Sequence, residues 1–338
     1  MKRSVHLRSR LARPLGLLLG ALLLPGSALA QSVEEALGTL AQENARLYLE
    51  PVTRGFGHAL SSTFFEGAQS RGLLSFNVGV RAAAALPPER ANTFRPVLPA
   101  QVHLNVRGTQ ESFQDPYTAS GNAESPTASG RGPGLVAVPQ GQLLEAIEET
   151  PGADPEDYHL RFPDGLDIPA VPFVVLEGNL GVGLSTELNL RVIPSLEISD
   201  ELGAMEALGV GIRHSLSDWI MLPTPVDVAV TGGVQSFSAG NYLSASGRSV
   251  GVAVGRSLGA VSVFAEGGVH TASLTVNYEL ENEALGVEGQ RTRFSADTGA
   301  SGRLAAGVHL QLALLSVSGQ FAAGDYNSVS IRAGLGTP

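Results

Sequence analysis

The amino-acid sequence predicts an all-β protein, an antiparallel transmembrane β-barrel of about 12 strands (range about 10–14) with an N-terminal helical plug or cap. Three observations predict this class. Ten segments alternate apolar and polar residues with a period of two, short and long connections between them largely alternate, and the N-terminus has the pattern of a secretory signal peptide.

The composition agrees with this class and excludes several others. The chain has 338 residues, of which 41 are glycine and none is cysteine, so no disulfide framework can form. Hydrophobic residues make up 43% of the chain and charged residues 16%, which argues against a disordered protein. Beyond the N-terminus there is no apolar run long enough for a transmembrane helix, which excludes a helical membrane protein.

Residues 1–30 have the three parts of a secretory signal peptide. A cationic start that runs from Lys2 to Arg13 precedes the apolar stretch 15–24, and Ala28-Leu29-Ala30 fits the small-x-small cleavage pattern. We expect cleavage after export; the alternative is an uncleaved anchor. The formal net charge is −10, and loss of this segment, with five cationic and no acidic side chains, would lower it to −15. Such a charge argues against nucleic acid and anionic lipid surfaces as partners.

Residues 31–70 are predicted to form the helical plug or cap. Within them, residues 33–49 place apolar side chains three and four positions apart, as an amphipathic helix does. Pro51 is expected to end this helix, because proline lacks the backbone N–H that the helix needs. Residues 54–70 predict a short second helix.

Residues 71–338 are predicted to form the barrel. Ten segments have one apolar and one polar face: 74–81, 176–182, 187–192, 208–213, 226–231, 250–255, 261–270, 303–312, 315–321 and 328–335. Several are long enough for the roughly 9–11 residues that cross a bilayer at a tilt. A soluble β-sandwich would also alternate, but its strands average about five or six residues, so strand length favours the barrel.

The proline-rich residues 85–170 interrupt this pattern. Only 101–107 alternates clearly, and 143–149 has the length of two helical turns. We predict a long excursion with one additional hairpin and a partly ordered loop; the alternative is a disordered insertion.

The lengths of the connections predict the orientation. Short turns such as 183–185 and 312–315 alternate with longer segments such as 194–204 and 275–300. In transmembrane barrels the short turns are periplasmic. The first strand therefore starts in the periplasm, and residues 33–70 are predicted to plug or cap the periplasmic half of the lumen.

Charged side chains on the polar strand faces are predicted to line the lumen and pair there, because charges that face lipid are costly. They are Glu177, Glu187, Arg191, Arg213, Asp227, Glu266, Arg303 and Arg332. A recess for an apolar ligand would need apolar side chains, for which Phe64, Phe65, Phe264 and His270 are the candidates. His309 is expected to approach His270 from the neighbouring strand.

A block at 203–235 carries a family resemblance. Gly209, Gly211, Arg213, His214 and Trp219, followed by Asp227 in a Pro-Val-Asp-Val strand, resemble the signature of a family of uncharacterised outer-membrane β-barrel proteins of Gram-negative bacteria. Residues 182–194 and 48–57 resemble further parts of the same family. The resemblance implies a barrel akin to the long-chain fatty-acid transporters, whose N-terminus enters the lumen, and it implies no catalytic residues. The chain ends in Gly336-Thr337-Pro338 without the usual terminal aromatic residue, which puts the insertion route in doubt.

No enzyme is predicted. The run Gly247–Gly251 matches G-x-S-x-G, but it lies inside a predicted strand, where no nucleophile elbow can form. No histidine spacing indicates a metal site, and no motif indicates a cofactor. Two functions stay open: a passive channel or transporter for apolar solutes, or a non-conducting structural or adhesive barrel with a filled lumen. The expected partners are outer-membrane lipid, the barrel assembly machinery and a small apolar solute, and the expected location is the bacterial cell outer membrane.

Overall fold

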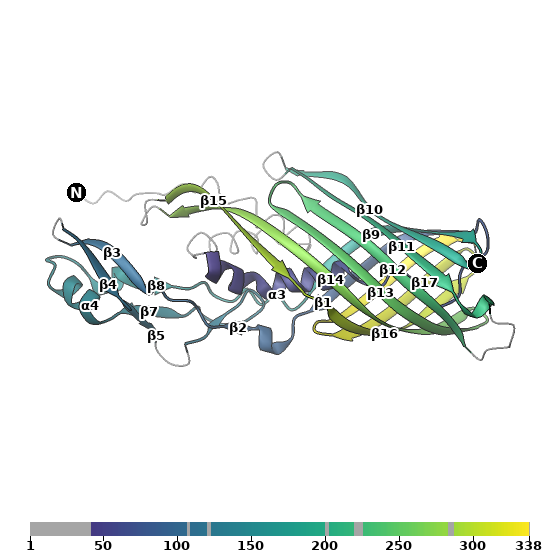
Figure 1. The fold of residues 1–338 in the computed structure, drawn as a ribbon, viewed down its shortest axis with the longest axis horizontal. Helices are drawn as coiled ribbons and strands as arrows, with labels where there is room; N and C mark the ends of the chain where they lie inside the picture. The colour runs from purple at the N-terminus through teal and green to yellow at the C-terminus, as the bar shows by residue number, and fades with distance from the viewer. Residues whose placement is uncertain are drawn as a thin grey trace.

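The computed structural model describes residues 42–106, 109–119, 123–199, 203–219, 226–282 and 287–337. The predicted signal peptide lies outside these residues. The described chain forms a barrel at one end and a smaller module of short strands and helices at the other, with a helix, α3, between them (Figure 1).

Ten antiparallel strands close the barrel. They are β1 (Phe76–Leu86), β9 (Val171–Gly183), β10 (Thr186–Ser199), β11 (Gly203–Ser215), β12 (Asp227–Ala239), β13 (Leu243–Leu258), β14 (Val261–Asn282), β16 (Ser301–Leu312), β17 (Leu315–Gly324) and β18 (Asn327–Gly336). Each pairs with its neighbours in chain order, and β18 pairs with β1 to complete the ring. An additional strand, β15 (Val287–Asp297), pairs with β14 beyond the point at which β16 leaves it, and lies outside the ring.

The ring of ten strands lies at the lower end of the predicted range of 10–14 and is smaller than the expected number of about 12, and each of the ten alternating segments corresponds to one strand of the ring. The additional hairpin exists, as β3 (Gln101–Val106) and β4 (Thr109–Gln114), but it forms a separate two-stranded sheet. Alternation of residues predicts a strand and does not reveal which sheet the strand joins.

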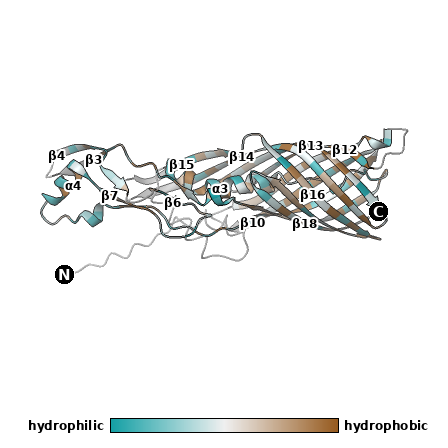
Figure 2. Ribbon diagram, turned by 90° about the horizontal axis from the view of Figure 1, so that it is seen from below, coloured by the Kyte–Doolittle hydropathy of each residue, from teal (hydrophilic) through white to brown (hydrophobic). Residues whose placement is uncertain are grey.

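The strands turn their apolar faces outward. On β1, for example, Val78 and Val80 are exposed, whereas Asn77 and Arg81 are buried in the lumen. Apolar and polar residues accordingly alternate along the barrel strands in Figure 2. This is the inverse of a soluble fold and is typical of transmembrane barrels.

The remaining described elements of residues 87–170 form the module. They are η1 (Glu89–Ala91), β2 (Thr93–Phe94), β5 (Tyr117–Ala119), β6 (Ser125–Pro126), β7 (Val136–Pro139), α4 (Gly141–Glu148), η2 (Pro155–Tyr158) and β8 (Leu160–Arg161). Strands β5, β7 and β8 form one small sheet, and β2 pairs with β6. The helical turns predicted at 143–149 fall in α4.

Helix α3 spans Gln42–Leu60 and contains Pro51, so the prediction that Pro51 ends the helix is wrong. Proline removes one hydrogen bond from the helix, but packing on both sides of this position outweighs that loss. Tyr48 and Leu49 before it and Phe56 and Leu60 after it are all buried. The short second helix predicted at 54–70 is the end of α3 followed by irregular chain.

The chain threads the barrel from one end to the other. Near the start of α3, Asn44 donates to the Val97 carbonyl of the module at 2.9 Å. After α3, residues 61–75, here called the threading segment, pass through the lumen. Arg71 of this segment donates to the Thr337 carbonyl beside the C-terminus at 2.8 Å. The prediction that the helix fills the short-turn half of the lumen is therefore wrong. The helix lies toward the module, at the end with the two longest connections, 87–170 and 283–300 (Figure 1).

Among the described residues, no helix combines the length and the apolar character that crossing a membrane requires.

Candidate functional site in the barrel lumen

A carboxylate, Glu177, lies at the centre of the lumen among three arginines. Its Oε1 accepts from Arg81 Nε at 2.7 Å and from Arg191 Nε at 2.6 Å, and its Oε2 accepts from Arg332 Nε at 3.0 Å. All four residues are at most 1% exposed. Glu66, from the threading segment, pairs with Arg81 as well. Buried charges are tolerated when they are paired and hydrogen-bonded in this way.

Two more ion pairs hold the threading segment. Arg213 pairs with Glu187 and also donates to the Gly67 carbonyl at 2.8 Å. Glu187 Oε2 in turn accepts from the backbone N–H of Arg71 at 3.1 Å. Toward the module, Arg303 lies 3.4 Å from Glu266 and donates to the Ser61 carbonyl. The wall thus binds backbone groups of the segment at these levels, and Glu187 also pairs with the Arg71 side chain at 3.5 Å.

An aromatic anchor, Phe64, fits into the wall at the same level. The Arg191 guanidinium lies 3.9 Å from the ring centroid, a cation–π contact, and donates to the Ser62 and Thr63 carbonyls at 3.1 and 2.5 Å. The ring packs on Gly211, where a Cβ would lie 2.6 Å from it, and on Gly233, where a Cβ would overlap it. These glycines make room for the ring.

Toward the module, α3 closes the barrel with an apolar layer. Phe56 packs edge-on against Phe173 of β9 and Phe237 of β12, with centroids 5.8 and 5.0 Å apart. Leu274 and Val276 of β14 belong to the same buried cluster. This part of the lumen is packed like the core of a soluble protein.

A histidine pair lies at the border of this layer. His58 Nδ1 and His270 Nε2 are 2.8 Å apart, and the ring of Tyr326 stacks on His58 at 4.9 Å. Burial lowers the pKa of His58 to about 4, with Arg303 and Arg54 acting in the same direction against Asp325. Burial also raises the pKa of Tyr326 to about 12. The His58 and Tyr326 rings are therefore both neutral near pH 7.

The family model that matches this sequence describes a family of unknown function, DUF6588, and covers residues 11–337. The chain belongs to this family. The resemblance to an uncharacterised family is thereby confirmed. No curated protein matches the sequence significantly.

Several solved structures resemble this DUF6588 protein weakly in shape. OpdO from Pseudomonas aeruginosa has 9% identity and a TM-score of 0.21, over 78% of this chain and 96% of that one. The CymD monoaromatic hydrocarbon channel has 8% identity and a TM-score of 0.21, over 85% and 96%. A P pilus tip assembly intermediate from E. coli has 11% identity and a TM-score of 0.20, over 70% and 28%.

Most of the charged residues that the sequence assigned to the lumen of this DUF6588 protein are buried there. Seven of the eight take part in the ion pairs above: Glu177 binds Arg191 and Arg332, Glu187 binds Arg213, and Glu266 binds Arg303. Asp227 is half-buried as the first residue of β12, at the barrel end that holds the C-terminus, and takes part in none of these ion pairs. The lumen of the described chain is therefore charged, and its charges are paired.

The residues of the predicted ligand recess do not share one recess. Phe64 lies over Arg191, and Phe65 lies 5.0 Å from the Arg213 guanidinium. Phe264 packs on Gly307, and His270 contacts His58 instead of His309. His309 is opposite Ser262, far along the ladder from His270, which pairs with Ser301, so the expected approach of the two histidines is wrong.

The family-like block divides between the two faces of β11. Gly209, Gly211 and Arg213 face the lumen, where they contact Gln235, Phe64 and Glu187 respectively. His214 faces outward, where its Nδ1 lies 2.9 Å from Thr186 Oγ1 and its ring 6.0 Å from that of Trp219. Trp219 is 62% exposed at the rim.

Sequence reasoning missed three residues of the site. They are Glu66 in the threading segment, His58 in α3 and Arg81 in β1. Arg81 occupies a polar position of an alternating strand, so the rule that found the other arginines would also have found it. Glu66 lies in irregular chain, where no periodicity gives a signal. Among the described residues, no group of three or more metal-binding side chains occurs.

Proposed function

We propose that this protein is an outer-membrane barrel of a Gram-negative cell that acts as a passive channel or transporter and is closed at rest by its own residues 42–72. The observation that carries the proposal is Arg191, which binds Glu177, the Ser62 and Thr63 carbonyls and the Phe64 ring at once. These contacts place the segment across the middle of the lumen.

The membrane location rests on the barrel exterior. Exposed aliphatic side chains lie on the outer face of all ten strands, for example Leu190, Val210, Val252 and Ile331. A band of this kind is stable in lipid and unfavourable in water. At the end that holds the C-terminus, three of the four connections are two residues long and the fourth is 216–226, whereas the two longest connections, 87–170 and 283–300, lie at the module end. We therefore assign the C-terminal end to the periplasm and the module with the start of α3 to the cell exterior.

The proposal of a channel rests on the wall behind the segment. Glycines face the segment at several levels, including Gly181 against Gly72, Gly247 against Ser61 and Gly255 against Ala68. If the segment moved out, these positions would leave a space lined by glycine and by paired arginine and glutamate. A small polar or charged solute suits such a wall. A small apolar solute is the alternative cargo, because the layer around Phe56 is apolar.

The test locks the segment to the wall. A Cβ at Gly247 would lie 2.7 Å from Ser61 Oγ, and the chain has no other cysteine, so the double variant S61C/G247C offers one disulfide. In planar bilayers we expect brief conductance openings for the wild type and the reduced variant, and none for the oxidised variant. The single variants S61C and G247C are the matched controls.

The second candidate function, a structural barrel with a filled lumen, predicts a different result. The buried apolar layer favours it, because separating such surfaces is costly. In that case neither the wild type nor the reduced variant conducts, and liposomes that contain the protein take up neither a labelled small anion nor a labelled hydrocarbon above empty liposomes. That result would refute the channel proposal.

A further inference from the structure

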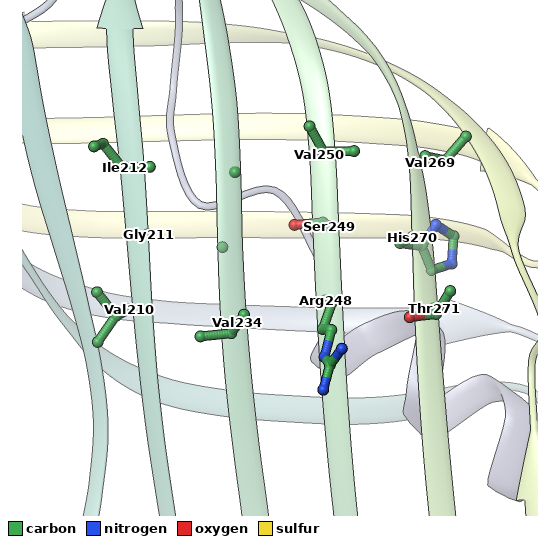
Figure 3. A pocket seen from close by; sticks show the side chains of 12 residues that line it. Val210, Gly211, Ile212, Val234, Arg248, Ser249, Val250, Val269, His270 and Thr271 are labelled. Carbon is green, nitrogen blue, oxygen red and sulfur yellow. The ribbon is translucent and has the colours of Figure 1, made fainter.

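The outer wall of the barrel has a groove over four strands, β11 to β14. It has a volume of about 490 Å³, within the roughly 300–1,000 Å³ typical of ligand sites, and is lined almost entirely by apolar atoms. Figure 3 shows the side chains of Val210, Ile212, Val234, Val250 and Val269 around a stretch of strand that bears no side chain.

The strand register explains the groove. Ile212, Gly232, Val250 and Val269 are direct neighbours across the four strands and form one outward-facing row. Three members of the row are exposed aliphatic side chains, and Gly232 supplies none. The groove is therefore a missing side chain in a continuous apolar wall, and in a membrane a lipid chain must fill it.

The next row toward the module contains a cation. Arg248 lies between Val234 on β12 and Thr271 on β14 and closes one edge of the groove (Figure 3). It is exposed, and it has no ion pair or hydrogen bond with the part of the chain that the structure describes. In the row beyond it, β12, β13 and β14 carry the hydroxyl side chains Ser236, Ser246 and Ser273, and β11 carries Leu208. Arg248 thus marks the border between the apolar band and the polar headgroup region.

We propose that this groove binds a lipid of the exterior leaflet, lipid A, with one acyl chain over Gly232 and a phosphate on Arg248. Charge complementarity decides the headgroup, because an unpaired guanidinium at a membrane border is satisfied by a phosphate. Position decides the leaflet, because Arg248 lies on the side of the module. The inference uses the membrane location and orientation proposed above, and it does not require that the barrel conducts.

The net negative charge of the chain does not oppose this site. A whole-chain charge governs long-range attraction to a surface, and it is screened over about 10 Å at moderate salt. A single guanidinium in contact with a phosphate acts within a few ångströms. The site therefore binds an individual lipid and does not recruit the protein to an anionic surface.

Two variants test the site without disturbing the fold. A side chain at Gly232 would point outward, with its nearest other atom, the Ser249 carbonyl oxygen, 3.6 Å from the Cβ, so Gly232→Leu fills the groove without strain. Arg248→Gln removes the charge. The matched control for the first variant is Gly319→Leu on β17, another open position of the strand face, with nothing within 4 Å of the added Cβ. The control for the second is Arg256→Gln, nearer the opposite end of β13.

The measurement is native mass spectrometry of the full chain released from nanodiscs that contain lipid A, phosphatidylglycerol or phosphatidylcholine. We expect the wild type to retain one lipid A molecule, at least tenfold more often than it retains phosphatidylcholine. G232L and R248Q should lose this preference for lipid A, and both control variants should keep it. The proposal would be overturned if G232L or R248Q retained lipid A as well as the wild type does, if G319L lost it as G232L does, or if the wild type preferred phosphatidylglycerol over lipid A. Lipid retention without conductance would still support it, which separates its failure from that of the channel proposal.

Discussion

Removal of the Glu177 charge should destabilise the barrel more than any surface charge change. Glu177 is 1% exposed and accepts from three arginines within 3.0 Å. In Glu177→Gln the shape is retained, but Arg81 and Arg332 keep only Glu66 as a charged partner, and Arg191 keeps none among the described residues. Breaking one buried ion pair by removal of a partner costs about 3–5 kcal/mol, so we expect at least this loss in the free energy of unfolding.

The single tryptophan makes the measurement direct. Trp219 lies at the rim, 62% exposed, and its fluorescence can follow urea unfolding of the refolded barrel in detergent. The control is Glu43→Gln, which breaks the exposed pair of Glu43 and Arg46 on α3 and should cost less than about 1 kcal/mol. A double variant, E177Q/R332Q, should recover part of the loss because one unpaired cation is removed. If E177Q and E43Q unfold at the same urea concentration, the cluster does not hold the barrel together.

The Phe64 anchor, the His58 ring and the orientation of the barrel can each be tested by substitution. Gly233→Val should displace Phe64 and raise bilayer conductance, whereas Gly178→Val, at an open position of β9, should not; equal conductance would place the closure elsewhere. The pKa of His58 is about 4 against about 6.5 in an unfolded chain, so the folded barrel binds fewer protons between these values. Stability should be full above about pH 6.5 and fall by up to about 3 kcal/mol toward pH 4, and a profile unchanged by His58→Phe would contradict this. A cysteine in place of Gln142 in α4 should react with an impermeant maleimide on intact cells, and one in place of Asp218 only after permeabilisation; the reverse would invert the orientation.

The barrel could be predicted from sequence because lipid and lumen impose opposite requirements on alternate residues. Every strand of the ring shows this alternation, and lumen charges such as Glu177 and Arg191 follow from it directly. The number of strands in the ring was overestimated because β3 also alternates, although it pairs with β4 in a separate hairpin of the module. A local pattern carries no information about the partner of a strand.

The threading segment could not be predicted from sequence to the same degree. Irregular chain satisfies its backbone groups with side chains of the wall, such as Arg213 on the Gly67 carbonyl, and no periodicity encodes such a contact. The Pro51 rule failed because propensity is weak against burial on both sides of the residue. The position of the helix was assigned to the wrong end because the sequence places it directly before the first strand, whereas residues 61–75 span the length of the lumen between them.

The charges of the wall give the threading segment an electrostatic role beyond filling space. In the described middle of the lumen, the strands contribute more buried arginines than glutamates: Arg81, Arg191, Arg213, Arg303 and Arg332 against Glu177, Glu187 and Glu266. The segment adds one carboxylate, Glu66, and one guanidinium, Arg71, so it leaves the net excess unchanged. It satisfies the wall arginines locally, because Glu66 and the carbonyls of Ser61, Thr63 and Gly67 accept from them.

A lumen that lost the segment would keep the cationic excess, and oppositely charged solutes would accumulate in it. The barrel opened by Gly233→Val should therefore prefer anions, with a reversal potential in a potassium chloride gradient on the chloride side of zero. Glu66→Gln in the same background should leave this preference unchanged, because the segment has already left the wall. A cation preference in the opened barrel would show that the strand arginines are neutralised by groups other than this segment.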